Sequence, residues 1–173
     1  MPRGLTRFQH CGSHHFVTFS CYHRLPHLST AQAAETFEHS LESIRVRYRW
    51  AILGYVVMPE HVHLLVNEPG HASLATAIQA LKISVAARRP QRPFWQRRYY
   101  DFNVHSAEKT REKLRYLHRN PMVRGLVVHP EEWPWSSFSH YLTGEKRTIE
   151  IESFWTEWRR EHGGESPSHL SHR

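Results

Sequence analysis

His61 and His63 flank a single valine and are followed by the apolar residues 64–66. In a β-strand, residues i and i+2 point to the same face about 6.6 Å apart along the axis, so the two imidazoles can converge on one ion. Val62 and the alternate residues after it would then face the core, while Leu65 would share the histidine face. The same pattern is also typical of two solvent-facing histidines on a half-buried strand.

Tyr116 and Asn120 stand four positions apart in a segment with a helical pattern. If the helix extends that far, they are neighbours on one of its faces. Two imidazoles and the carbonyl oxygen of Asn120, with open positions, suit Mg²⁺ or Mn²⁺ in contact with phosphate better than a closed zinc site. Taken singly, Tyr116 would also fit an aromatic residue that packs between helix and sheet, and Asn120 before Pro121 an ordinary helix end.

A basic and aromatic segment separates these two groups of residues. Interleaved guanidinium groups and rings can hold phosphates and stack unpaired bases, as in proteins that bind single-stranded nucleic acid. The candidate DNA-binding residues are Arg88, Arg89, Arg97 and Arg98, with Lys82 before the segment and Arg124 after it. A solvated strand edge whose rings face the core would have the same composition.

The chain is strongly basic, with 23 Lys and Arg against 16 Asp and Glu and a formal net charge of +7. This balance favours a polyanionic partner, because each neutralised phosphate releases condensed counterions. The 173 residues are enough for one domain with a proper core. Residues 51–58, the longest apolar run, fall far short of the roughly 20 residues that span a bilayer. With two cysteines and no signal-peptide pattern, we expect a cytoplasmic protein without membrane contact.

Periodicity predicts the order strand–helix–strand–strand–helix–strand–helix. Ser29 with Gln32 resembles a capping box for the first helix, expected over about residues 30–48, and Ser73 and Ser106 can cap the next two. Pro121 disfavours continuation of the last helix beyond residue 118 or 120. The expected strands cover residues 14–22, 50–58, 61–67 and 94–104.

This order predicts an α+β fold with a mostly antiparallel sheet, in which residues 50–67 form a hairpin. The helices can cover one face of the sheet, which would leave the other for a ligand. Residues 133–141 are aromatic and irregular and are expected to wrap onto the core. Residues 1–145 would form the domain and 146–173 a C-terminal extension, disordered from about residue 163, where apolar side chains are lacking.

Two segments, VMPEHVHLLV at 57–66 and YLHRNPMVRGLV at 116–127, stand in an order and at intervals that resemble the HUH single-tyrosine transposases. More narrowly, they are similar to the REP-associated tyrosine transposases, whose second segment has the pattern Tyr-Ile-His-x-Asn-Pro-Val-Arg-Ala-Gly-Leu-Val. WQRR at 95–98 and EWPWSS at 132–137 extend the resemblance over roughly residues 12–141. Met122 is an extra residue after the proline and departs from the family pattern.

The resemblance implies an HUH, ferredoxin-like transposase domain over residues 1–145. It implies that His61, His63 and Asn120 hold a divalent Mg²⁺ or Mn²⁺ ion and that Tyr116 is the nucleophile. A phenol with the ordinary pKa of about 10 is mostly protonated at neutral pH. A metal ion that stabilises the developing charge would let this weak nucleophile attack a phosphodiester. Glu112, one turn before Tyr116, is a candidate general base.

The implied reaction is cleavage and transfer of single-stranded hairpin DNA, as in repetitive extragenic palindromes, through a 5′-phosphotyrosine. A monomer is expected, with the C-terminal segment covering the region where related transposases dimerise. One alternative is a hairpin-binding protein without cleavage, although such a protein would not need all four site residues. Another is a histidine-triad nucleotide hydrolase or transferase, but Leu65 occupies the place of its third histidine.

Overall fold

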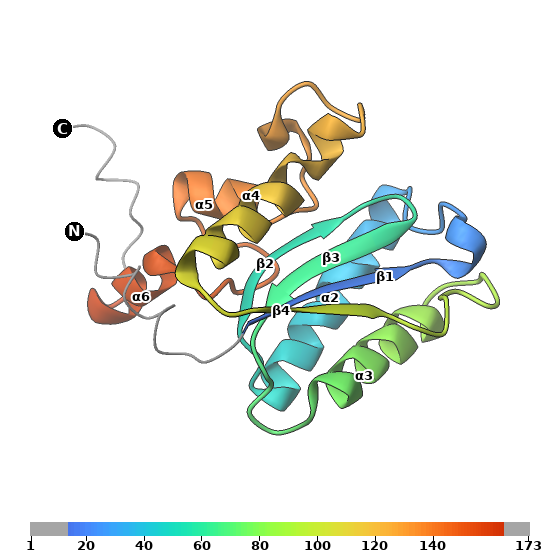
Figure 1. Cartoon of the computed structure of the whole chain (residues 1–173), viewed down its shortest axis with the longest axis horizontal. Helices are drawn as coiled ribbons and strands as arrows, with labels where there is room; N and C mark the ends of the chain where they lie inside the picture. Colours follow the sequence, from blue (N-terminus) through green and yellow to red (C-terminus); the bar gives the residue numbers. More distant parts are fainter. Residues whose placement is uncertain (1–13, 165–173) are drawn as a thin grey trace.

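A four-stranded sheet of strand order β2-β3-β1-β4 forms the centre of the molecule, with helices on both of its faces (Figure 1). The structure is a computed structural model, and it describes residues 14–164. Its strands are β1 (His14–Ser20), β2 (Ile52–Val57), β3 (His61–Val66) and β4 (Tyr100–Val104). Its helices are η1 (Tyr22–Arg24), α2 (Ala31–Tyr48), α3 (Leu74–Ala87), α4 (Ala107–Val123), η2 (Pro130–Glu132), α5 (Phe138–Thr143) and α6 (Phe154–Glu161).

All three pairings between these strands are antiparallel, which confirms the predicted fold class. The predicted hairpin is formed by β2 and β3, and β1 lies between β3 and β4. In the β1–β3 register Thr18 stands opposite His63 and Ser20 opposite His61. The end of β1 therefore lies beside the histidine pair.

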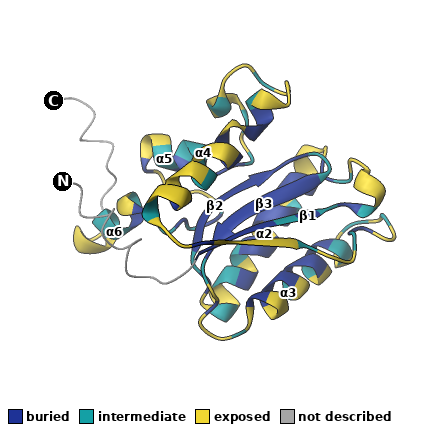
Figure 2. Ribbon diagram, viewed as in Figure 1, coloured by how far each residue is buried: buried dark blue, intermediate teal, exposed yellow. Residues whose placement is uncertain are grey.

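The face of the sheet that α2 and α3 cover carries the larger apolar core. Val62, Leu64 and Val66 of β3 are buried there in one cluster with Phe37 of α2 and Ile78 of α3. The sheet is dark blue along most of its central strands in Figure 2, because both of its faces are covered. Burial of each such side chain stabilises the fold by about 1.5–3 kcal/mol.

The opposite face is covered in part by α4, so the expected ligand-binding face is reduced to the region that the helix leaves accessible. Leu117 of α4 packs in a smaller apolar cluster with Phe16 of β1 and Leu65 of β3. Helix and sheet approach closely at Gly54, where a Cβ would lie only 2.5 Å from Leu114 Cδ1. As predicted, Leu65 shares the face of the histidines, and this face lies under a helix.

Two helix ends differ from the prediction. The N-cap of α2 is Thr30, whose hydroxyl accepts from Ala33 N at 3.1 Å, so Ser29 does not form the predicted capping box. Ser73 and Ser106 are the N-caps of α3 and α4, as predicted. Helix α4 runs through Pro121 to Val123 instead of ending before the proline. A proline is tolerated here because only the last turn follows it, so few backbone hydrogen bonds are lost.

The fourth strand begins at Tyr100, six residues later than predicted. The residues before it still run beside β1: Trp95 forms a single bridge with Cys21, and Gln96 N donates to Ser20 O at 2.9 Å. The Nζ of Lys82 donates to the carbonyl oxygens of Gln96 at 2.6 Å and of the next residue at 3.3 Å. These carbonyl groups are satisfied by a side chain and not by a strand.

Residues 133–141 pack onto β2 as predicted, although residues from Phe138 onward form the short helix α5 instead of an irregular segment. Ser136 bridges Val56, and Ser137 Oγ accepts from Tyr55 N at 3.0 Å. Further on, Ile151 forms a parallel bridge with Ile52. The free edge of β2 is therefore covered at two places by the chain that follows α4.

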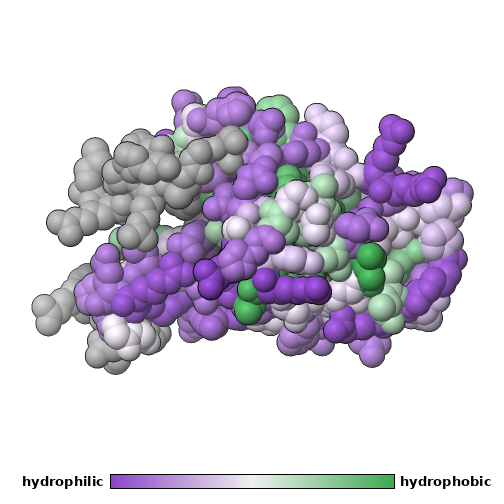
Figure 3. All heavy atoms as spheres, turned by 90° about the horizontal axis from the view of Figure 1, so that it is seen from below, coloured by the Kyte–Doolittle hydropathy of each residue, from purple (hydrophilic) through white to green (hydrophobic). Residues whose placement is uncertain are grey.

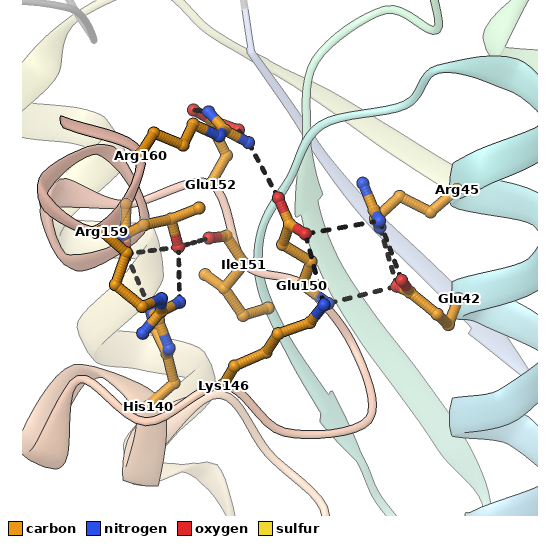
Figure 4. Close-up of polar contacts among 11 residues, drawn as sticks. Glu42, Arg45, His140, Lys146, Glu150, Ile151, Glu152, Arg159 and Arg160 are labelled. Atoms are coloured by element: carbon orange, nitrogen blue, oxygen red, sulfur yellow. Dashed lines mark hydrogen bonds and ion pairs between the residues drawn. The ribbon is translucent and has the colours of Figure 1, made fainter. Parts of the chain in front are cut away.

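Ion pairs attach the C-terminal segment to α2 (Figure 4). The carboxylate of Glu150 lies 2.8 Å from Arg160, 3.8 Å from Lys146 and 3.9 Å from Arg45 of α2. The domain boundary expected at residue 145 stays a prediction, and most of the disorder expected from residue 163 falls on 165–173, outside the described residues. Among the described helices, none is long and apolar enough to cross a membrane. Seen from below, the surface is largely hydrophilic, with small separate hydrophobic patches (Figure 3).

Candidate active site

The imidazoles of His61 and His63 meet beneath α4, with their Nε2 atoms 3.0 Å apart. Both side chains are buried. On the far side of each ring, Nδ1 has a partner: Glu60 Oε1 lies 3.0 Å from His61 Nδ1, and Thr18 Oγ1 lies 2.7 Å from His63 Nδ1. A histidine that donates Nδ1–H to a carboxylate is left with a lone pair on Nε2, which is how a metal-binding histidine is oriented.

Asn120 of α4 completes this group from the helix side. Its Nδ2 lies 3.2 Å from His63 Nε2, and its Oδ1 is buried without a hydrogen-bond partner. A buried polar atom without a partner costs about 1–3 kcal/mol. With His61 donating through Nδ1, its Nε2 lone pair is directed at His63 Nε2, which in turn lies beside the amide of Asn120, so these groups stand close enough to share one cation.

This donor set fits a divalent ion. Two imidazole nitrogens and one amide oxygen suit a hard or borderline cation with open positions. In residues 14–164 no group of three or more His, Cys, Asp or Glu could hold a metal ion, so the amide oxygen of Asn120 is needed as the third ligand. Burial lowers the pKa of His61, and burial together with the neighbouring His61 lowers the pKa of His63 to about 3. Both rings are thus neutral near pH 7, the form that binds metal ions.

Tyr116 lies beside the histidine pair, with its side chain 53% exposed. Its ring makes edge-to-face contacts with His63 and with Phe16, at centroid separations of 5.6 and 5.9 Å. The Nζ of Lys113, one turn earlier on α4, lies 5.8 Å from the centroid of the same ring. These contacts orient the ring while leaving the side chain accessible to a substrate.

A pocket of about 560 Å³ joins these groups. Tyr116, both histidines and Asn120 line it, and so does Glu112. Four guanidinium groups surround them and give the pocket a positive wall: Arg24, Arg115, Arg119 and Arg124. Such a pocket is suited to an anionic ligand with accessible oxygen atoms, such as a phosphodiester.

Comparison with known proteins identifies the family. The model of the family described as "Transposase IS200 like" matches residues 9–120. The chain belongs to the IS200-like transposase family. It is 24% identical over 124 residues to the REP-associated tyrosine transposase of Escherichia coli (strain K12), a match that covers 71% of this chain and 74% of that protein. This confirms the resemblance found in the sequence motifs.

A solved structure of a REP-associated tyrosine transposase bound to a REP hairpin shares the fold of this transposase. The two superpose with a TM-score of 0.67 at 20% sequence identity, over 82% of this chain and 86% of the other. The sheet and the helices packed on it are therefore those of a tyrosine transposase. The chain is an enzyme of the transposase class.

The predicted DNA-binding residues of this transposase lie in two pockets and around the C-terminal half of α3. Arg124 lies in the Tyr116 pocket, where its guanidinium is 2.9 Å from Glu60 Oε1. Arg97 and Arg98 line a separate groove together with the aromatic residues Tyr22 and Trp95.

The remaining three lie on or beyond α3. Arg88 and Arg89 follow the end of the helix, and Arg88 donates to Ser84 O at 3.0 Å. Lys82 is buried, its ammonium is engaged by the segment before β4, and burial lowers its pKa. Lys82 is therefore not part of the proposed DNA-binding surface.

Several residues of the pocket were not predicted from the sequence. Thr18 and Glu60 hold the two histidines, and Arg24, Arg115 and Arg119 add to the positive wall. Arg115 and Arg119 stand four positions apart on α4, each directly before a predicted site residue, so helical spacing could have found them. Thr18 depends on the strand register, and Arg24 on an unusual turn, for which the local sequence carries no signal.

Proposed function

We propose that this transposase cleaves and rejoins single-stranded DNA in the Tyr116 pocket, through a covalent 5′-phosphotyrosine and with the help of a divalent metal ion. One observation carries the proposal: a solvent-accessible tyrosine on α4 lies in the same positively lined pocket as a buried His61–His63–Asn120 donor set. The residues come from two segments more than 50 positions apart in the sequence, so local folding alone does not explain their meeting.

His61 Nε2, His63 Nε2 and Asn120 Oδ1 would hold Mg²⁺ or Mn²⁺. When bound, the ion supplies neutralisation of charge on a phosphate oxygen and so stabilises the transition state. Glu60 and Thr18 orient the two imidazole ligands, because each forms a hydrogen bond with the Nδ1 atom of one ring. The unpartnered Oδ1 of Asn120 supports this assignment, since a cation would satisfy it.

In the proposed reaction the Oη of Tyr116 forms a bond to phosphorus as the bond between phosphorus and the 3′ oxygen breaks. The phenolic proton passes to a base, and the departing 3′ oxygen gains a proton to become a hydroxyl. Glu112 lines the same pocket one turn before Tyr116 and is the candidate base, although Lys109 lies 3.1 Å from its carboxylate. Attack by another 3′-hydroxyl reverses the step and joins strands without external energy, because the phosphotyrosine conserves the bond.

The proposed substrate is single-stranded DNA that folds into a hairpin of the REP type. The solved structural relative is bound to a REP hairpin, and the pocket of this chain presents four arginines to a backbone. Arg97 and Arg98 beside Tyr22 and Trp95 offer a second contact, where bases could stack. A monomer is proposed as well, because Ser136 and Ile151 pair with β2 and cover the edge that a second copy would need.

The test is a denaturing gel of the protein incubated with Mn²⁺ and a pool of labelled single-stranded hairpin oligonucleotides. The wild type should give a slowly migrating covalent adduct, and Tyr116→Phe should give none while still binding DNA. Tyr100→Phe is the matched control, because Tyr100 is 65% exposed on β4 and lies outside the pocket. Binding without any adduct in the wild type would instead favour a hairpin-binding protein that does not cleave.

A further inference from the structure

The turn after β1 holds two consecutive non-glycine residues in the left-handed region, His23 with φ 52° and Arg24 with φ 54°. For residues with a Cβ this conformation is strained, and it persists only where the surroundings impose it. Here hydrogen bonds hold the turn against the β2–β3 connection: Cys21 N donates to Glu60 O at 2.8 Å, and Leu28 N to Pro59 O at 2.9 Å. The strained turn is therefore attached to the segment that carries His61.

The strain places the guanidinium of Arg24 in the Tyr116 pocket. Arg24 lines the pocket with Tyr116, and its Nη2 lies 3.3 Å from Glu60 Oε1 while 57% of its side chain stays exposed. An ion pair with so exposed a partner is screened by solvent and contributes little to stability, which does not offset the strain of the turn. The ion pair alone thus does not account for the position of Arg24, and strained residues of this kind are typical of ligand-binding sites.

The carboxylate that holds Arg24 is already crowded. Oε1 of Glu60 lies 3.3 Å from Arg24, 2.9 Å from Arg124 and 3.0 Å from His61 Nδ1, so two guanidinium groups and one imidazole share a single oxygen. A guanidinium is a planar fork that pairs best with two oxygens at once. A phosphodiester offers two non-bridging oxygens and would pair with the arginines more completely than Glu60 does.

We propose that Arg24 is a phosphate-binding residue of the Tyr116 pocket. Its guanidinium separates from Glu60 and binds a backbone phosphate of single-stranded DNA. This rests on the proposed function and adds a residue that no sequence motif includes. Arg24, from the turn after β1, and Arg124, from the end of α4, reach the same carboxylate from different elements, so both can close on one phosphate. Glu60 keeps its hydrogen bond to His61 when they do.

The test is the salt dependence of binding to a 20-nucleotide oligo(dT), together with the rate of adduct formation on the hairpin pool. Each phosphate contact to a single strand contributes about 0.7 to the slope of log K against log salt. Arg24→Gln should lower the slope by about that amount and slow the adduct by about 10- to 100-fold, the worth of a charged hydrogen bond. Arg47→Gln, an exposed arginine of α2 outside the pocket, should change neither.

Arg24→Gly separates binding from a structural role. Glycine adopts positive φ without strain, so this variant should unfold at a higher temperature than the wild type and yet lose the same salt slope and adduct rate as Arg24→Gln. If both Arg24 variants keep the wild-type slope and rate, the assignment of Arg24 is overturned and the proposed function stands. If the wild type itself neither binds oligo(dT) nor forms an adduct, the proposed function fails, and the role of Arg24 fails with it.

Discussion

The two faces of the sheet differ in what their side chains do: one carries the larger apolar core, and the other carries the candidate active site. On the face toward α2 and α3, β3 contributes Val62, Leu64 and Val66 to a continuous apolar core. On the face toward α4, the same strand contributes His61 and His63, which are buried beside polar partners and an unpartnered amide oxygen. Residues that alternate along one strand thus serve two different purposes.

This contrast predicts which substitutions should unfold the protein and which should leave it folded but inactive. The polar atoms buried on the apolar face have partners, such as the hydroxyl of Tyr55, which donates to Glu38 Oε1 at 2.6 Å, so the stability of this face depends mainly on packing. The histidine face carries polar groups whose cost is offset only in part within the free protein, a feature typical of sites that bind a ligand. Stability and activity should therefore respond separately to changes on the two faces.

The largest effect on stability is expected from Leu64→Ala. The side chain is fully buried in the core against α2 and α3, and its truncation should lower the free energy of unfolding by about 2–5 kcal/mol. Urea denaturation followed by circular dichroism measures this. Val46→Ala, at a site 62% exposed on α2, should change the free energy of unfolding by less than about 0.5 kcal/mol. Equal losses in the two variants would contradict the division between the faces.

Asn120→Ala tests the opposite face. Mn²⁺ at about 100 times its Kd should stabilise the wild type by about 2.7 kcal/mol, which appears as a higher Tm. The variant lacks the amide oxygen, so we expect it to lose most of that Mn²⁺-dependent increase. Its metal-free Tm should change less, since removal of the unpartnered oxygen offsets part of the loss of the hydrogen bond to His63. An undiminished response to Mn²⁺ would remove Asn120 from the metal site.

Glu60→Gln should have a smaller effect on the same property. The amide keeps the shape of the side chain but weakens the hydrogen bond that orients His61, and loss of such a partner typically lowers metal affinity by about 10- to 100-fold. Titration with Mn²⁺ followed by calorimetry measures the affinity. Glu35→Gln, an exposed carboxylate on α2, is the control and should keep the wild-type affinity. The same affinity in both variants would show that Glu60 does not support the site.

The smallest effect concerns His140, a buried histidine outside the pocket. Its Nε2 lies 2.6 Å from Ser153 Oγ, and burial lowers its pKa from the ordinary 6.5. The unfolded chain therefore binds the proton first as the pH falls, so the stability present above pH 6.5 is lost progressively below it. Urea midpoints between pH 7 and pH 5 should fall less steeply in His140→Gln than in the wild type. Parallel pH profiles would contradict this.

Much of the fold was predictable because the decisive signals are local. Alternation along residues 61–66 predicted which side chains of β3 face the core, and Ser73 and Ser106 predicted two helix starts. Ser29 and Thr30 are adjacent residues that can both cap a helix, and Ser is the more common N-cap, so only the structure identifies Thr30. Lys82 follows Ile78 by four positions on α3, a spacing that could have indicated its burial, but its charge led to its prediction as a surface residue.

Only those residues of the site that lie within the two sequence motifs could be predicted. The positions of His61, His63, Asn120 and Tyr116 follow from two short segments, and the structure brings them into one pocket. Glu60 reads in the sequence as a turn residue, and its three partners come from different parts of the chain. Arg24 reaches the pocket because its backbone has a positive φ, and no glycine in the turn indicates this conformation in the sequence. Such contacts depend on tertiary packing and cannot be derived from spacing.

The most direct test of the central claim is to locate the covalent bond. The adduct formed with hairpin DNA and Mn²⁺ is digested with nuclease and trypsin, and the peptides are weighed by mass spectrometry. Trypsin cleaves after Arg115 and Arg119, so the account predicts the mass of a nucleotide on the tetrapeptide Tyr116–Arg119, which contains a single tyrosine. A nucleotide found instead on the peptide that begins at Tyr99, after Arg98, would contradict it.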